Sequence, residues 1–143
     1  MKLVVIDEQL ARTPPIADSE LLSGLCTALF RLYPAGQPPL PWAGYLAEEE
    51  GTYVGTCAFK SVPTEGKVEI AYFTFPGHEG RGVATRMAQR LVALATRPEV
   101  TQVSAQTLPE KNASTRILEK LGFKFVGPVM HPEDGEVWEW HLR

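Results

Sequence analysis

Residues Pro76–Thr85 read PGHEGRGVAT, and the period of the apolar residues changes across this stretch. Before it, KVEIAYFTF (67–75) carries the two-residue alternation and the β-branched and aromatic residues of a strand. Behind it, Val83, Met87 and Leu91 recur at the spacing of a helix with one apolar face. The stretch therefore predicts a strand, a glycine-rich turn and a helix, in that order.

The two glycines of this turn allow a second interpretation. Gly80 and Gly82 have no Cβ, so an anion can approach the backbone closely. The first N–H groups of a helix are unpaired and stand at the positive end of its dipole, which favours a pyrophosphate. Arg81 would add a positive charge and Thr85 a hydroxyl donor. A plain turn between strand and helix would use the same glycines, so both interpretations stay open here.

Two common nucleotide-binding motifs are excluded at this turn. A Walker A loop continues with Lys and Ser or Thr after its last glycine, whereas Gly82 is followed by Val83 and Ala84. A dinucleotide fingerprint has a third glycine where this chain has Thr85.

The rest of the chain predicts a mixed sheet with helices. Helical patterns run from Ser19 to Pro34, over 82–97, and over NASTRILEKL (112–121), which Gly122 ends. Strand patterns occupy 2–6, 44–50, 52–62, 67–75, 100–108, 123–129 and 136–142. Hairpins come first and strand–helix–strand units follow. This order predicts a single α/β domain over 1–143, with a central, mixed, strongly twisted sheet of about six to seven strands and helices on both faces.

Composition excludes several classes of protein. The net charge is −3 over 143 residues, which argues against a nucleic-acid partner. No apolar run approaches the roughly 20 residues needed to cross a bilayer. Cys26 and Cys57 lie far apart and lack metal-ligand spacing, so we expect two buried free thiols and no metal. We expect a cytoplasmic protein without nucleic-acid or membrane partners.

A second motif lies one strand downstream of the glycine turn, where Asn112–Phe123 read NASTRILEKLGF. Together with VEIAYFTFPGHEGRGVAT, it resembles the GNAT superfamily of acyl-CoA-dependent N-acetyltransferases. Its form looks most like the branch that contains the ribosomal-protein N-terminal acetyltransferases. The resemblance implies transfer of an acetyl group from acetyl-CoA to a primary amine, on a protein N-terminus or a small molecule, in a ternary complex. It also implies a possible homodimer. An acyl-CoA-binding sensor or partner module without catalysis is the alternative.

The resemblance further implies which residues hold acetyl-CoA. The strands at 67–75 and 100–108 would splay apart around the pantetheine arm, and main-chain groups of Phe73, Thr74 and Phe75 would bind it. Asn112 would reach the cofactor or simply cap its helix. Glu79 stands where the family usually has Gln or Arg, which is unfavourable beside a phosphate unless the side chain points away. The pyrophosphate would lie on the backbone amides of Gly80, Arg81, Gly82, Val83, Ala84 and Thr85.

The catalytic residues are less defined by the sequence. Glu69 is the best candidate for a general base, since burial in a covered sheet makes a carboxylate a stronger base. Many family members carry a Tyr acid where this chain has Leu118. Ser114 is the nearest hydroxyl on that helix and is the candidate acid, although it could equally satisfy local backbone. Tyr72 is a third option, on the strand face opposite to Glu69.

Two segments are candidates for substrate selection, the Pro-rich loop 34–44 and the connection 131–136. The connection holds Glu133, Asp134 and Glu136, which would attract a cationic amine or merely form a polar turn. Trp138 and Trp140 share one face of the last strand, so we expect them to pack in a core or at a dimer contact.

Overall fold

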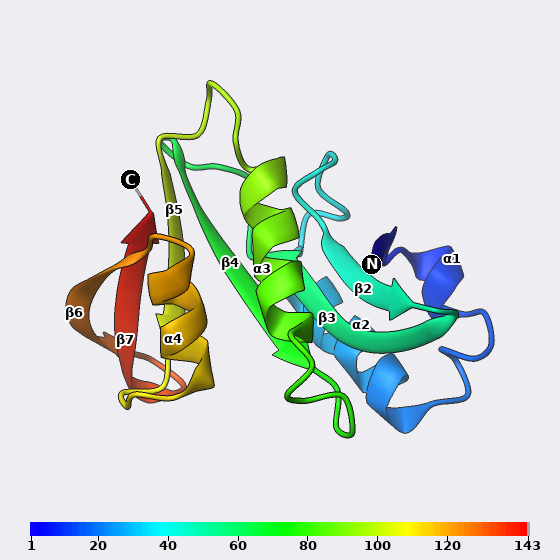
Figure 1. Cartoon of the computed structure of the whole chain (residues 1–143). Coiled ribbons are helices and arrows are strands. Elements are labelled where there is room, and N and C mark those ends of the chain that lie inside the picture. The colour runs from blue at the N-terminus through cyan, green and yellow to red at the C-terminus, as the bar shows by residue number, and fades with distance from the viewer. Residues whose placement is uncertain (143) are drawn as a thin grey trace.

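A computed structural model describes residues 1–142 and places seven strands in one sheet of order β1-β2-β3-β4-β5-β7-β6 (Figure 1). Every pair of neighbouring strands is antiparallel except β4 and β5, which are parallel. The mixed α/β sheet expected from the sequence is therefore confirmed. The strands are β1 (Lys2–Val5), β2 (Gly44–Glu49), β3 (Thr52–Phe59), β4 (Lys67–Thr74), β5 (Gln102–Thr107), β6 (Lys124–His131) and β7 (Gly135–Leu142).

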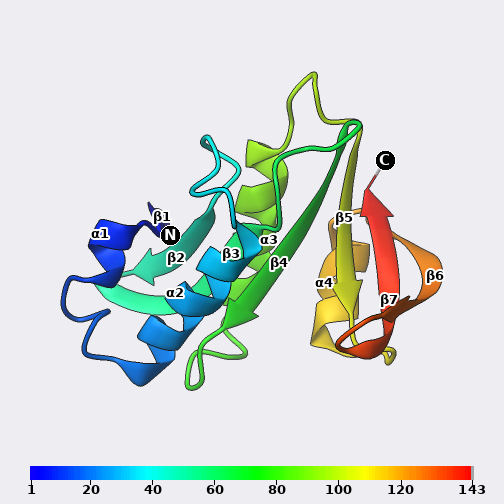
Figure 2. The same ribbon diagram turned by 180° about the vertical axis from the view of Figure 1, so that it is seen from behind.

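Helices cover both faces of the sheet, as predicted. Helices α3 (Val83–Leu94) and α4 (Ala113–Lys120) lie on one face, and α2 (Glu20–Leu32) lies on the other (Figures 1 and 2). A short helix, α1 (Glu8–Ala11), was not predicted because a single turn leaves too short a pattern. Met87 and Leu91 of α3 are fully buried against the sheet, and Leu29 of α2 is buried in a second cluster on the opposite face.

The ends of the elements follow the residues that predicted them. Ser19 caps α2, where its hydroxyl accepts a hydrogen bond from the Leu22 N–H at 3.2 Å. Glu50 and Gly51 both have positive φ (51° and 77°), which gives the tight turn between β2 and β3. Gly122 follows α4 with φ of 95°, a conformation that suits glycine after a helix.

Strands β4 and β5 separate within the sheet. Their parallel pairing runs from Lys67 and Gln102 to Ile70 and Ala105, but β4 continues to Thr74. Beyond Ile70, β4 stays with β3 while β5 stays with β7. Figure 1 shows the two ribbons diverging towards the N-terminal ends of α3 and α4. A gap therefore opens in the sheet beside both helix starts.

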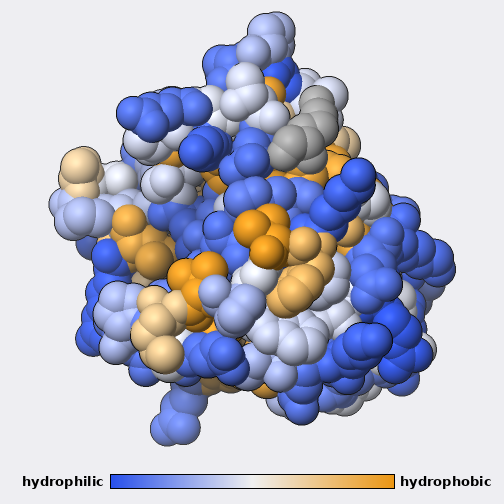
Figure 3. Space-filling view, turned by 90° about the vertical axis from the view of Figure 1, so that its left-hand side faces the viewer, coloured by the Kyte–Doolittle hydropathy of each residue, from blue (hydrophilic) through white to orange (hydrophobic). Residues whose placement is uncertain are grey.

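Strand β6 forms one edge of the sheet and exposes several apolar side chains. Figure 3 faces this edge and shows apolar groups separated by polar ones. Phe125, Val126, Val129 and Met130 are each at least 40 % exposed. A bulge between Phe125 and Gly127, and Pro128 behind it, interrupt the strand. Both features hinder another strand from pairing with this edge.

Three other predictions about the fold have clear outcomes. Cys26 and Cys57 are buried free thiols, as expected. Trp138 and Trp140 do share a face, where both contact Phe125. Across residues 1–142, no helix has the length and apolar character that crossing a membrane requires.

Candidate functional site

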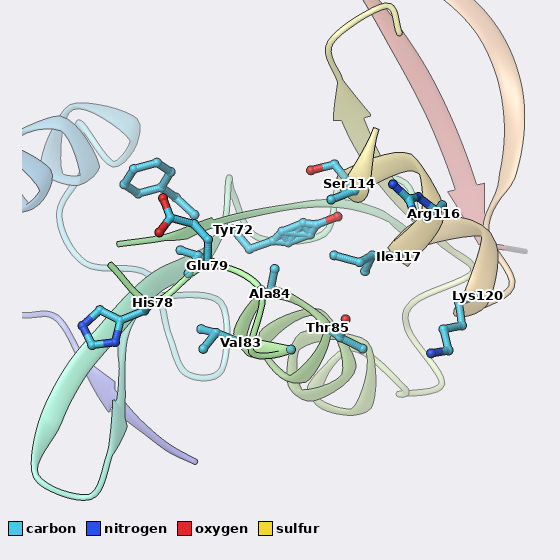
Figure 4. Close-up of a pocket in the computed structure, with 15 residues that line it drawn as sticks. Tyr72, His78, Glu79, Val83, Ala84, Thr85, Ser114, Arg116, Ile117 and Lys120 are labelled. Atoms are coloured by element: carbon cyan, nitrogen blue, oxygen red, sulfur yellow. The ribbon is translucent and has the colours of Figure 1, made fainter. Parts of the chain in front are cut away.

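The gap between β4 and β5 leads into a groove of about 760 Å³. Its walls are the end of β4, the glycine turn with the first residues of α3, and one face of α4 (Figure 4). The residues that line it are Tyr72, Phe73, Thr74, His78, Glu79, Gly80, Gly82, Val83, Ala84, Thr85, Ala113, Ser114, Arg116, Ile117 and Lys120. The two motifs that the sequence singled out thus lie on opposite walls of one groove.

The glycine turn presents unpaired N–H groups at this groove. Gly80 and Gly82 both have φ of 76°, in the left-handed region that favours glycine. Gly82 begins α3, and no side chain among residues 1–142 caps that helix end. Because an uncapped helix start carries orphan N–H groups and partial positive charge, it suits an anion. Thr85 adds its hydroxyl in the first turn.

Arg86 holds this turn in place, a role that the sequence did not reveal. Its guanidinium donates two hydrogen bonds of 2.8 Å to the Glu49 carboxylate on β2. A third, at 2.9 Å, goes from Nη1 to the Arg81 carbonyl. A bidentate Arg–carboxylate pair fixes the guanidinium plane. The Arg81 side chain itself lines the neighbouring cavity beside Glu49 rather than the groove.

Glu79 lines the groove with its charge retained. Its carboxylate accepts a hydrogen bond from the Gly77 N–H at 2.8 Å. The N–H groups of Glu79 itself and of Gly77 hold the pKa of Glu79 below its usual value. The carboxylate is therefore folded back onto its own turn at Gly77, before the N–H groups of Gly80–Thr85 that were expected to meet an anion.

The main chain of β4 corrects one prediction. Hydrogen bonds from Lys60 N–H to the Glu69 carbonyl and from Phe75 N–H to the Val54 carbonyl direct the odd-numbered residues of β4 and its extension towards β3. Because these directions alternate along a strand, the N–H and C=O groups of Tyr72 and Thr74 face the gap. Of the three residues predicted to bind pantetheine through their main chain, only Thr74 keeps that geometry. The main chain of Phe73 faces β3 by this alternation, whereas Phe75 donates its N–H to Val54 of β3 and accepts from the His78 N–H of the turn.

Tyr72 brings an unpaired hydroxyl to the top of the groove. Its side chain lies on the α4 side of β4, close to Ser114 and Ile117 (Figure 4). The hydroxyl oxygen is shielded from solvent and has no well-formed hydrogen bond within the described residues. Burial raises the pKa of Tyr72 to about 12, and the side chain of Ser114, placed for a weak hydrogen bond with the phenol, acts in the opposite direction. The phenol is therefore protonated at neutral pH and can donate a hydrogen bond to a ligand in the groove.

Glu69 lies on the other face of β4, as alternation predicts. Val68 and Ile70 are buried on the α3 side, whereas Glu69 points away from it and is 26 % exposed. Its Oε2 is 2.7 Å from Nζ of Lys60. Its cross-strand neighbour is Ser104 of β5, at the level where the two strands still pair. Glu69 therefore stands just before the gap, ion-paired and on the face opposite to Tyr72.

Asn112 and Ser114 begin α4 in different ways. Asn112 is the helix cap: its Oδ1 accepts from the Thr115 N–H at 3.1 Å, and the Thr115 hydroxyl accepts from the Asn112 N–H at 3.0 Å. Its side chain is thus engaged in a capping box, whereas Ser114 lines the groove. The sequence interpretation overlooked Arg116 and Lys120. Their four-residue spacing on α4 was the signal, since it places both cations on one helix face.

The two segments expected to select substrate lie apart from the groove walls. Trp42 in loop 34–44 is buried beneath Arg97, at the C-terminal end of α3, whereas the groove is at its N-terminal end. In the connection 131–136, the N–H groups of Glu133 and Asp134 donate to His131 Nδ1 at 3.2 and 3.3 Å. This geometry is that of a polar turn.

Comparison with known proteins agrees with this arrangement. The family model described as the acetyltransferase (GNAT) domain matches residues 7–124. An uncharacterized N-acetyltransferase, p20, from Bacillus licheniformis is 30 % identical over 84 residues, which are 57 % of this chain and 47 % of that protein. The chain thus spans about half the length of this curated relative.

Solved structures give the same fold. The aminoglycoside acetyltransferase AAC(6′)-Ib in complex with coenzyme A is 25 % identical, with a TM-score of 0.61 over 70 % of this chain and 65 % of its own. The protein yncA from Salmonella typhimurium, solved with its cofactor acetyl-CoA, has a TM-score of 0.64 over 100 % of this chain and 94 % of its own, at 16 % identity. A ribosomal-protein-alanine N-acetyltransferase from Brucella melitensis has a TM-score of 0.66 over 85 % and 77 %, at 18 % identity. By the family match over most of its length, this chain belongs to the acetyltransferase (GNAT) domain family.

Proposed function

We propose that this protein transfers an acetyl group from acetyl-CoA to a primary amine by direct attack in a ternary complex. One observation carries the proposal: an uncapped helix start with two left-handed glycines opens into the groove that continues to the gap between β4 and β5. A molecule with a pyrophosphate at one end and a narrow arm at the other fits that combination. Acetyl-CoA has this shape.

Different residues of the groove would bind different parts of acetyl-CoA. The N–H groups from Gly80 to Thr85 would bind the pyrophosphate. Arg116 and Lys120, on the opposite wall, would face the same negative charge. The free main-chain groups of Tyr72 and Thr74 would hydrogen-bond the pantetheine amides, as a further strand would. Asn112 would contribute by fixing the start of α4 rather than by contact.

The reaction requires a proton to leave the amine and a proton to reach the thiolate. Glu69 is our candidate base and would act through a water molecule, since it stands before the gap and is paired with Lys60. Tyr72 is our candidate acid: its O–H would donate to the sulfur as the C–S bond breaks. Ser114, which is partly exposed, would return a proton from solvent to the phenolate. This relay gives the predicted Ser114 a role beside Tyr72.

The relatives offer different acceptors. A structure of AAC(6′)-Ib holds coenzyme A together with kanamycin, while the Brucella melitensis protein is named for ribosomal-protein alanine. We keep both a protein N-terminus, which the motif resemblance favours, and a small-molecule amine as acceptors. A module that binds acetyl-CoA without catalysis is the second candidate, and the charged Glu79 inside the groove is the observation in its favour.

Calorimetric titration with acetyl-CoA, with ATP and NAD as controls, tests the proposal. Saturable binding of acetyl-CoA alone, followed by release of free thiol when amines are added, is the expected result. Binding without thiol release from any amine would favour the non-catalytic module. A folded protein that does not bind acetyl-CoA would refute both functions.

A further inference from the structure

We propose that the acceptor carries an apolar group next to its amine, and that this group binds in a second groove between α2 and the β3–β4 face of the sheet. The inference deepens the proposed function and rests on it. It concerns the acceptor alone, so it can fail while acetyl transfer stands.

The second groove has a volume of about 300 Å³ and an apolar lining. No charged side chain is among the described residues that form it. They are Leu25, Ala28, Leu29, Leu32, Thr56, Cys57, Ala58, Ala71, Tyr72 and Phe73. The volume is at the lower end of the range for ligand pockets, which suits a group the size of a side chain.

Helix α2 carries an apolar stripe beyond what the core uses. Leu29 and Cys26 are buried in the cluster below the helix. Leu21, Leu25, Ala28 and Leu32 follow one another at spacings of four, three and four residues, so they share a second face. Leu21 and Leu32 remain 44 % and 45 % exposed, and Phe73 of β4, which lines the groove together with Leu32, is 48 % exposed. Leu32 and Phe73 thus leave large apolar surface exposed at the groove, although the Phe73 ring also contacts Phe75 edge-on.

This groove is continuous with the site where the thioester would lie. Tyr72 and Phe73 line both grooves, and the two grooves lie on opposite faces of β4. At that level β4 no longer pairs with β5, so the sheet is open from one face to the other. An amine seated on the α2 side therefore meets a carbonyl held in the gap from the side opposite to the α3–α4 groove.

The charges around the second groove speak against a polycation. The nearest acidic residue on this face of β4 is Glu69, two residues before Ala71, and Lys60 already pairs with it at 2.7 Å. The acidic turn that holds Glu133 and Asp134 lies in the β6–β7 hairpin, on the far side of β5. A polyamine or an aminoglycoside would bring several ammonium groups to an apolar surface without partners, which costs free energy.

A matched series of amines tests the inference on the whole chain of 143 residues. We would measure kcat/KM by thiol release for n-butylamine, n-hexylamine, hexane-1,6-diamine and kanamycin. Burying a methylene contributes about 0.8 kcal/mol, or about fourfold, so n-hexylamine should exceed n-butylamine by about fifteenfold. The diamine has the same chain but ends in a second charge, and it should fall well below n-hexylamine.

Two variants test whether the dependence on chain length arises in the second groove. Leu32→Asp places a carboxylate in the groove and should lower kcat/KM for n-hexylamine while raising it for the diamine. Met130→Asp makes the same kind of change at a 74 % exposed site on β6 and should leave the series unchanged. Both variants should bind acetyl-CoA as the wild-type protein does.

Several outcomes would overturn the inference. They are a flat response to chain length, a preference of the wild-type protein for the diamine or kanamycin, and a Leu32→Asp series identical to wild type. Sedimentation velocity adds another: if the protein is a dimer that Leu32→Asp dissociates, a second copy covers the groove. If acetyl-CoA does not bind at all, the proposed function has failed instead.

Discussion

Replacing the glycines of the turn tests whether their conformation serves binding or only the fold. Gly80→Ala and Gly82→Ala both force a side chain into φ of 76°, at a cost of about 1 kcal/mol. A Cβ on Gly80 meets nothing within 4 Å, whereas one on Gly82 would lie 3.0 Å from Arg86 Nη1. Arg86 is anchored to Glu49 and to the Arg81 carbonyl, so Gly82→Ala should also disturb that bond, for a total of about 2 kcal/mol.

These free-energy costs should appear as measurable decreases in Tm. At about 2.1 cal/mol/K per residue, the unfolding entropy of 143 residues is about 0.3 kcal/mol/K, so 1 kcal/mol lowers Tm by about 3 °C. We expect about 3 °C for Gly80→Ala and about 6 °C for Gly82→Ala. Gly36→Ala is the matched control, because its φ is 100° and its surroundings are equally open.

The affinity for acetyl-CoA should distinguish the two turn variants from the Gly36→Ala control. Misaligning one N–H that donates to a phosphate loses about 1.5–3 kcal/mol, which raises the Kd for acetyl-CoA about 10- to 150-fold. Calorimetric titration should show this loss in both turn variants but not in Gly36→Ala. If all three lost only Tm and bound acetyl-CoA equally, the glycines would serve the turn alone and the pyrophosphate site would be refuted.

Four further substitutions probe single side chains of the site. Tyr72→Phe should lower kcat with little change in Tm, because among the described residues the hydroxyl it removes makes no well-formed hydrogen bond and has only Ser114 beside it; an unchanged kcat would remove Tyr72 as the acid. Glu69→Gln should slow transfer and leave the Kd for acetyl-CoA intact, and a rate that is unaffected at every pH would exclude it as the base. Glu79→Gln should tighten acetyl-CoA binding, more at low salt than at high salt, since it removes a charge of the same sign as the phosphates; equal Kd values at both salt concentrations would show that this charge does not reach the ligand. Glu49→Gln tests how the stability of the fold depends on pH. The hydrogen bond from Arg86 lowers the pKa of Glu49 in the folded protein. The Glu49–Arg86 pair therefore stabilises the fold fully above the ordinary pKa of 4.5, and this stabilisation disappears as the pH falls through the lower folded pKa. Urea unfolding should therefore find Glu49→Gln less stable than wild type at pH 7, with a difference that vanishes in acid; a difference that persists there would have another cause.

Local patterns were sufficient for most of the fold. The change of period at Pro76–Thr85, the caps at Ser19 and Asn112, and the glycine after α4 all act over a few residues, so the chain alone places the helices and strands. The uncapped, glycine-rich start of α3 was predictable for the same reason. Helix α1 was missed because one turn is too short to show a period.

Contacts between distant segments decided the rest of the site. Glu49 and Arg86 are 37 residues apart, and their bond exists only because the fold brings the end of β2 beside the first turn of α3. The direction in which the main chain of Tyr72 and Phe73 points depends on the register of β4 against β3, which no local pattern records. The sequence by itself determined the elements and the glycine turn, since both arise from short-range preferences. Only the tertiary structure decided which hydroxyl, which carbonyl and which apolar stripe face the gap, because packing and register fix those directions.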